Sequence, residues 1–139
     1  MNILILEDGV GAIYLTEMLK DIGHKAYHAF SLLEAQDIWQ STEVHCLIVD
    51  LMLDPTGLTD DEICRSKCGC LTGWIWLSNY IFPEFSHMRD RTIIVSEYIE
   101  ELKKYCNESE LQGVTLIHKF EGSKSMLGRI LEIARMLER

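Results

Sequence analysis

Short β-type runs, most of them apolar, alternate along this chain with segments of helical periodicity, and this alternation constrains the fold most strongly. The runs are Asn2–Leu6, Lys25–Phe30, Val44–Val49, Thr92–Val95 and Val114–Ile117. Helix-like segments lie between or after them, at Gly11–Ile22, after the capping residue Ser31, and at Gly73–Tyr80, Tyr98–Cys106 and Ser123–Glu138. Continuously apolar strands are typical of a parallel sheet buried on both faces. The pattern therefore predicts an α/β fold, a five-stranded parallel sheet in a doubly wound (βα)5 arrangement.

Length, composition and charge limit the number of domains and the classes of function that this chain can have. The 139 residues fit one domain, residues 1–139, and leave little room for a second. Apolar residues make up 47% and charged residues 25%, the balance of a folded globular protein. The net charge of −9 argues against nucleic-acid binding, because the phosphate backbone requires clustered Lys and Arg. The same charge is compatible with a bound cation or a basic partner.

No export or membrane segment is visible. The apolar run Asn2–Leu6 meets Glu7 and Asp8 at once and has no basic flank, unlike a signal peptide. The aromatic-rich stretch Leu71–Phe82 is too short to cross a bilayer. A cytoplasmic location away from membranes is therefore expected, and the five cysteines, an odd number, are expected to be reduced thiols.

One segment, Asp54–Thr72, interrupts the alternation. It is polar, has no sustained periodicity and is therefore interpreted as a loop inserted after the third strand. Its cysteines Cys64, Cys68 and Cys70 allow a zinc site, with His87 as a fourth ligand, but their spacing is not that of a usual zinc knuckle. A mobile segment that governs access or partner choice is the favoured interpretation.

Charged and hydroxyl side chains follow four of the predicted strands. They are Glu7 and Asp8 after the first, Asp50 after the third, Ser96 after the fourth and Lys119 after the fifth. The carboxyl ends of parallel strands share one edge of a sheet, where ligands bind in open α/β folds. Clustered carboxylates suit Mg²⁺, which binds a few protein oxygens and keeps water molecules in its other coordination positions. A remaining carboxylate can then accept a phosphoryl group, with the cationic and hydroxyl groups neutralising its charge.

In this order of residues the sequence resembles the receiver domains of two-component response regulators, which have a flavodoxin-like fold. The matching motifs are Glu7-Asp8, Leu47-Ile48-Val49-Asp50-Leu51-Met52, Ile93-Ile94-Val95-Ser96 and Leu116-Ile117-His118-Lys119. The resemblance covers the whole chain except the inserted loop. It implies a phosphoprotein that acts in phosphorelay signal transduction and is not an enzyme in the usual sense.

The resemblance also implies a role for each matched position. Asp50 corresponds to the phosphoacceptor, Ser96 to the switch hydroxyl and Lys119 to the cation that pairs with the phosphoryl group. The implied Mg²⁺ ligands are Glu7, Asp8, Asp50 and the carbonyl group of Met52. The implied phosphoryl donor is a histidine kinase or a phosphotransfer protein. A stand-alone domain would then signal through a downstream protein target, and a homodimer is left open.

Three positions depart from the family pattern. Glu97 replaces the small residue expected after the switch hydroxyl, Leu116 replaces the aromatic residue three before the lysine, and Phe120 replaces the cis-proline after it. These departures favour, as an alternative, a phosphate-independent interaction module that keeps the receiver fold. A phosphohydrolase is disfavoured because its second acid would fall at Met52, and a dinucleotide loop at Gly9-Val10-Gly11 lacks its third glycine.

Overall fold

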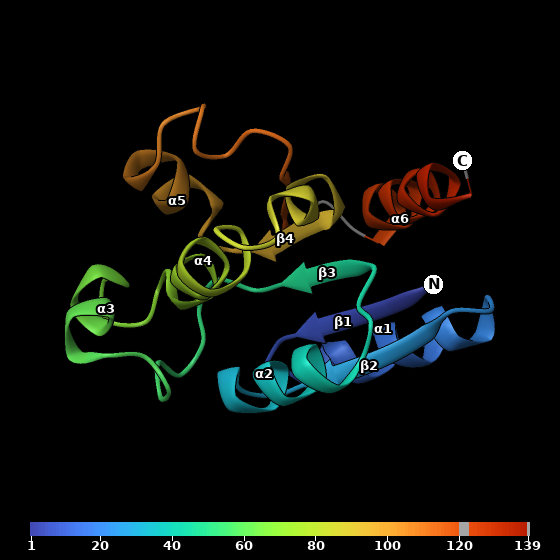
Figure 1. Cartoon of the computed structure of the whole chain (residues 1–139), viewed down its shortest axis with the longest axis horizontal. Coiled ribbons are helices and arrows are strands. Elements are labelled where there is room, and N and C mark those ends of the chain that lie inside the picture. Colours follow the sequence, from blue (N-terminus) through green and yellow to red (C-terminus); the bar gives the residue numbers. More distant parts are fainter. Residues whose placement is uncertain (120–122, 139) are drawn as a thin grey trace.

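The computed structural model describes residues 1–119 and 123–138. Its centre is a parallel sheet in the order β2-β1-β3-β4-β5 (Figure 1). The strands are β1 (Asn2–Leu6), β2 (Lys25–Ala29), β3 (Cys46–Val49), β4 (Thr92–Ser96) and β5 (Thr115–His118). Leu6 pairs with Val49 and Ser96 with His118, so neighbouring strands end at one edge of the sheet. The predicted fold class is confirmed.

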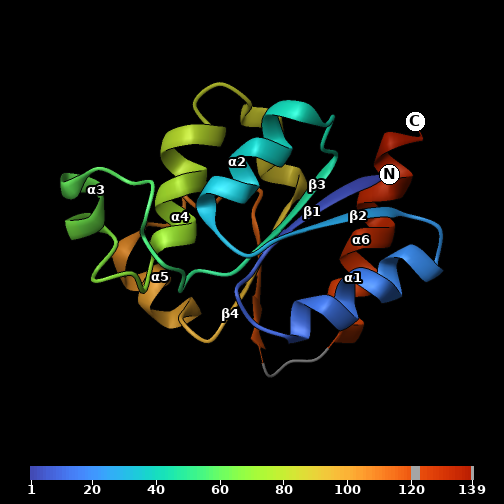
Figure 2. The ribbon, with the colours of Figure 1, turned by 90° about the horizontal axis from the view of Figure 1, so that it is seen from below.

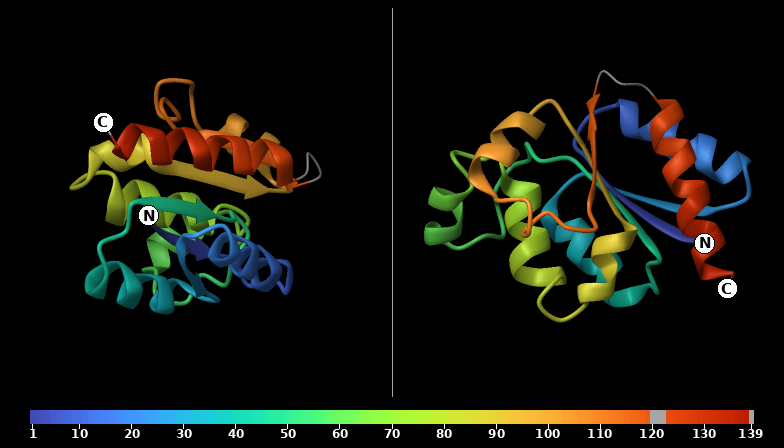
Figure 3. Two further views of the ribbon diagram at one scale, coloured as in Figure 1. Left: turned by 90° about the vertical axis from the view of Figure 1, so that its right-hand side faces the viewer. Right: turned by 90° about the horizontal axis from the view of Figure 1, so that it is seen from above.

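Helices cover both faces of the sheet. Helices α1 (Gly11–Asp21) and α6 (Ser123–Leu137) pack on one face, together with Ile3, Ile5 and Ile48. Helices α2 (Leu32–Ser41), α4 (Thr72–Trp76) and α5 (Ile99–Tyr105) pack on the other, together with Leu4 and Val49. Figures 2 and 3 show the two layers on opposite sides of the sheet. Successive residues of a strand point to opposite faces, so nearly every central-strand residue is buried.

Local chemistry defines the helix ends. Gly23, with φ of 98°, follows α1 in the left-handed conformation that closes many helices. The predicted cap of α2 is present, because the amide of Glu34 donates to Ser31 Oγ at 3.2 Å. The Glu34 carboxylate accepts from the amide of Phe30 rather than from Ser31, so the reciprocal bond falls one residue earlier than a capping box requires.

The segment Asp54–Thr72 is not the irregular loop that the sequence predicted. It contains a helix, α3 (Asp60–Arg65), which begins with a complete capping box between Thr59 and Glu62. Glu62 is only 6% exposed, and its carboxylate also accepts hydrogen bonds from Asn79 and Tyr80. These bonds outweigh the cost of burial and lower the pKa of Glu62 to about 2. The sequence did not predict this helix because the buried residue that anchors it, Glu62, is a carboxylate and not an apolar side chain.

The predicted helix Gly73–Tyr80 is divided between two elements. Helix α4 runs directly into a π-helix, η1 (Leu77–Ile81), and a 3₁₀-helix, η2 (Ser86–Arg91), leads into β4. Trp74 and Trp76 of α4 are both buried. The indole of Trp76 donates to Gln36 Oε1 at 3.1 Å, which satisfies its polar atom inside the core. No helix in the described part of the chain is long and apolar enough to span a membrane.

Candidate phosphoacceptor site

Asp50 lies at the carboxyl end of β3, where the chain leaves the sheet. Its amide donates to the carbonyl of Leu6 at 2.9 Å, which continues the pairing of β3 with β1. The amide of Leu51 donates to Asp50 Oδ1 at 2.7 Å, and the residue is 7% exposed. A nearly buried carboxylate needs such partners to remain ionised. The strand and the first amide beyond it therefore hold this side chain in a fixed position.

Lys119, just past β5, joins two of the predicted carboxylates. Its Nζ lies 3.1 Å from Asp50 Oδ2 and 2.9 Å from Glu7 Oε1. Partial burial alone would lower the pKa of this ammonium group, but the hydrogen bonds and charges of Glu7 and Asp50 outweigh it and raise the pKa. Lys119 is therefore a permanent cation at neutral pH, and both oxygens of Asp50 have partners.

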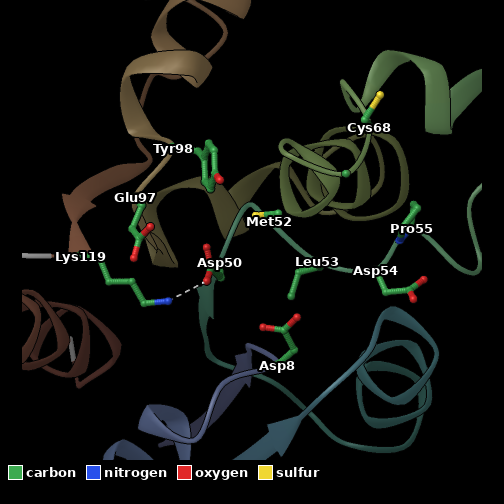
Figure 4. Close-up of a pocket in the computed structure, with 11 residues that line it drawn as sticks. Asp8, Asp50, Met52, Leu53, Asp54, Pro55, Cys68, Glu97, Tyr98 and Lys119 are labelled. Carbon is green, nitrogen blue, oxygen red and sulfur yellow. Dashed lines mark hydrogen bonds and ion pairs between the residues drawn. The ribbon is translucent and has the colours of Figure 1, made fainter.

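A cavity of about 430 Å³ opens beside Asp50. Its walls come from four strand ends and from the segment after β3, and they are formed by Asp8, Asp50, Met52, Leu53, Asp54, Pro55, Cys68, Gly69, Glu97, Tyr98 and Lys119. Figure 4 shows the carboxylates of Asp8 and Glu97 directed toward Asp50 from opposite sides. The cavity is thus an acidic site with one ammonium group, which suits a cation together with an anionic group.

The predicted Mg²⁺ ligands are brought together only in part. Asp8, Asp50 and Met52 line the cavity, whereas the Glu7 carboxylate is engaged with Lys119. Across residues 1–119 and 123–138 there is no group of three or more His, Cys, Asp or Glu side chains arranged to hold a metal, and this includes the three cysteines of the segment after β3. Mg²⁺ typically takes one or two protein carboxylates, phosphate oxygens and waters. The pair Asp8 and Asp50 therefore fits that ion.

Ser96 stands at the end of β4, as predicted, but its side chain does not line the cavity. The residue is fully buried, and its Oγ accepts a hydrogen bond from the amide of Tyr98 at 3.2 Å. The next two residues, Glu97 and Tyr98, reach the cavity instead. Sequence patterning missed the part played by Tyr98, since its spacing matched only the start of a helix.

The three departures from the family pattern have different outcomes. Glu97 is exposed and lines the cavity, while Lys119 pairs with Glu7 and Asp50. Leu116 is half-buried and packs against the core on the α2, α4 and α5 face. Phe120 lies outside the described residues.

Helix α4 makes very close contact with the peptide group of Asp50. The amide of Gly73 donates to the carbonyl of Leu51 at 3.0 Å. A Cβ atom at Gly73 would lie 2.0 Å from the carbonyl oxygen of Asp50, a distance that no side chain tolerates. Glycine at this position therefore lets the first turn of α4 rest on the backbone that carries Asp50. The sequence does not reveal this requirement, because Gly73 matches the helical period like any other residue.

Comparison with known proteins identifies the fold through solved structures and not through sequence. No protein-family model and no curated protein sequence matches the chain. A response regulator receiver domain protein from Methanospirillum hungatei matches with a TM-score of 0.68 at 16% identity, over 99% of this chain and 96% of that chain. A receiver domain protein from Clostridium thermocellum gives a TM-score of 0.58 at 16% identity, over 99% and 96%. A sensor protein from Polaromonas gives 0.60 at 22% identity, over 96% and 93%.

The receiver domain of the hybrid histidine kinase CckA is a further neighbour, with a TM-score of 0.54 at 17% identity. These likenesses extend over nearly the full length of both chains in each pair, so they describe the whole fold rather than a shared fragment. The five-stranded parallel sheet flanked by helices agrees with them. The fold of this chain is therefore that of a response regulator receiver domain.

Proposed function

We propose that this protein is a signalling receiver domain that accepts a phosphoryl group on Asp50 in a Mg²⁺-dependent reaction. One observation carries the proposal: the carboxylate of Asp50 shares Lys119 with Glu7 beside a cavity that Asp8 also lines. A nucleophilic carboxylate, a permanent cation and a second acid for a metal are thus assembled at the edge where α/β folds bind ligands.

The proposed reaction moves one phosphoryl group. An oxygen of Asp50 attacks the phosphorus of a phosphohistidine, so that an O–P bond forms while the N–P bond of the donor breaks. The leaving imidazole nitrogen recovers its electron pair and is free to bind a proton. Lys119 stays within reach of the new group and neutralises part of its charge, and such electrostatic stabilisation contributes much of the catalysis of phosphoryl transfer.

Asp8 and Asp50, with Met52 beside them, are the residues that would hold Mg²⁺. The bound ion would neutralise phosphoryl oxygens and offset the repulsion between the two carboxylates. The chain itself supplies the orientation, because the amide of Leu51 fixes one oxygen of Asp50 and Lys119 contacts the other.

The cellular setting is proposed from this chemistry. The donor is a histidine kinase or a phosphotransfer protein in the cytoplasm, and the output is a contact with a downstream protein target. Formation of a homodimer is proposed as a separate contact. The proposal treats the chain as a phosphoacceptor rather than as an enzyme with a substrate of its own.

Intact-mass spectrometry tests the proposal. Incubation with acetyl phosphate and Mg²⁺ is expected to add one phosphoryl mass to the protein and none to Asp50→Asn. A circular dichroism spectrum of the variant serves as the folding control. Phosphorylation that persists in Asp50→Asn would sink the assignment.

A second candidate is a phosphate-independent interaction module with the receiver fold. Two observations favour it: Glu7 is paired with Lys119, and the Ser96 hydroxyl accepts a bond from Tyr98 outside the cavity. In that case acetyl phosphate adds no mass even to the natural chain, while the fold and its protein contacts are unaffected by Asp50→Asn.

A further inference from the structure

A second cavity, of about 260 Å³, lies at the opposite edge of the sheet from Asp50. Its lining residues precede strands instead of following them: Thr42–His45 lead into β3, and Arg91 immediately precedes β4. In a parallel sheet the strand starts and the strand ends lie at opposite edges. This cavity therefore shares no residue with the phosphoacceptor site, and a ligand bound in it is independent of the proposed function.

Aromatic rings form one wall of this cavity. Trp39 from α2 and Phe85 from the connection before η2 meet edge to face, with ring centroids 5.3 Å apart at 76°. Both rings are half-buried, and Val44 and Met88 beside them are buried. Such a wall offers a planar ring an offset or edge-on contact, a geometry that aromatic groups prefer.

Arg91 supplies a cation to the same cavity. In the described part of the chain its guanidinium group has no hydrogen-bond or ion-pair partner, although the residue is half-buried. The neighbouring arginines differ: Arg89 lies over the ring of Phe82 at 4.7 Å, and Arg129 bonds Glu132 and the carbonyl of Asp90. A half-buried guanidinium group with unpaired donors is well suited to a carboxylate, which it binds through two parallel hydrogen bonds.

His45 adds a hydrogen-bond donor. Its Nδ1 accepts the amide of Asn2 at 2.9 Å, so Nε2 is the ring nitrogen that donates. The closest carboxylate, Glu43 Oε1, lies 3.7 Å from Nε2, which is too long for a hydrogen bond. The backbone thus fixes His45 as a donor beside Arg91 and the aromatic wall.

We infer that this cavity binds a small aromatic carboxylate, with the acid group on Arg91 and the ring against Trp39 and Phe85. The cavity is smaller than the roughly 300–1,000 Å³ typical of drug-sized ligands. It therefore suits a ligand of one ring and one acid group. A carboxylate without a ring makes no contact with the rings of Trp39 and Phe85. A ring without an acid group leaves Arg91 unpaired.

Benzoate is the test ligand, with acetate and benzyl alcohol as the two incomplete probes. Each probe is titrated into the full chain, and the NMR signals of the His45 ring and the Trp39 indole N–H report binding. Benzoate is expected to bind saturably. Benzyl alcohol lacks the charge-assisted hydrogen bonds to Arg91, and acetate lacks the ring contact with Trp39 and Phe85, so each is expected to bind at least about tenfold more weakly. Equal affinities for all three probes would contradict the inference.

Arg91→Gln is expected to weaken benzoate binding about tenfold or more. Lys104→Gln removes one positive charge from an exposed position on α5 and is expected to change nothing. If Arg91→Gln does not fold, Arg91→Lys keeps the charge without the planar fork, and the same direction of effect is expected. Asp50→Asn should bind benzoate like the natural chain. Signals that shift at Lys119 instead of His45, or unchanged affinity in the Arg91 variant, would overturn the inference.

Discussion

Lys119 Nζ lies 2.9 Å from Glu7 Oε1 and 3.1 Å from Asp50 Oδ2, so this one ammonium group bridges the ends of β1 and β3 from its place after β5. The bridge ties together three strands whose residues are far apart in sequence. It also means that Glu7, one of the predicted Mg²⁺ ligands, is engaged with Lys119. A cation that binds beside Asp8 and Asp50 competes with Lys119 for the carboxylate of Asp50.

The first prediction concerns the charge of Lys119. Glu7→Gln is expected to lower the pKa of Lys119 toward the ordinary lysine value, because it removes one of the two carboxylates that raise it. An NMR titration of the lysine Cε signals measures the change. Glu100→Gln removes the partner of an exposed lysine, Lys103, and should leave the Lys119 titration unaltered. An unchanged Lys119 titration in Glu7→Gln would show that the bridge does not form in solution.

The second prediction concerns Mg²⁺. A ligand at 100 times its dissociation constant raises the free energy of unfolding by about 2.7 kcal/mol. Saturating Mg²⁺ is therefore expected to raise the melting temperature of the natural chain, and Asp8→Ala should remove most of this rise. The exposed Asp37 on α2 provides the control, since Asp37→Ala should keep it. Thermal melts that coincide with and without Mg²⁺ would favour the phosphate-independent module.

The third prediction concerns Glu97, whose carboxylate faces the cavity beside Asp50 (Figure 4). A negative charge there repels the incoming phosphoryl group by about 1 kcal/mol, which corresponds to roughly fivefold in rate. Glu97→Gln keeps the size and removes the charge, so it should take up phosphate from acetyl phosphate about that much faster. Glu97→Ala additionally removes bulk. Identical initial rates for all three chains would refute an electrostatic role.

The fourth prediction concerns Glu62 and pH. Its folded pKa, about 2, lies below the ordinary value of 4.5, so the ionised carboxylate stabilises the fold above pH 4.5 and this contribution disappears as the pH falls toward 2. Glu62→Gln is expected to lose on the order of 3 kcal/mol at neutral pH. Urea unfolding at several pH values should show the difference from the natural chain shrinking in acid. Glu84→Gln, at an exposed position, should show no such convergence.

The fifth prediction concerns Gly73. Alanine there would force α4 away from the Asp50 backbone, and a loss of about 2 kcal/mol or more in the free energy of unfolding is expected. Gly128 of α6 is the matched control, since nothing lies within 4 Å of a Cβ at that position. Gly128→Ala should stabilise the protein by about 1 kcal/mol, because alanine favours a helix interior. Two substitutions of one kind are thus expected to act in opposite directions, and equal effects in denaturant unfolding would contradict the close contact.

The sequence alone predicts that replacement of Thr56–Cys70 by a short Gly/Ser linker leaves the fold intact. The structure changes that expectation, because Glu62, Ser66 and Gly69 of this segment are buried and Glu62 is bonded to η1. The segment also lines the cavity beside Asp50 through Asp54, Pro55, Cys68 and Gly69. The replacement is now expected to destabilise the protein, which a thermal melt would reveal, and to open one wall of the site.

The sequence by itself determined the sheet, because continuous apolar runs such as Cys46–Val49 have no stable place except between two helical layers. It also determined which residues share the carboxyl edge, since Asp50 and Lys119 each follow a strand of the same direction. The sequence did not predict which side chains pair with one another. Whether Glu7 turns to Lys119 or to the cavity depends on distances between residues that are remote in the chain, and no local pattern encodes them.

Only the tertiary structure decided the remaining features. The helix α3 is too short to show a period and depends on one buried carboxylate bonded to Asn79 and Tyr80. Gly73 matters because Asp50 lies against it, and Arg91 matters because neither its neighbours in the sequence nor those in space pair with it within the described residues. Periodicity records which face of an element is apolar. It does not record which polar atoms come into contact once the layers have packed, and such contacts shape the cavity beside Asp50 and the one beside Arg91.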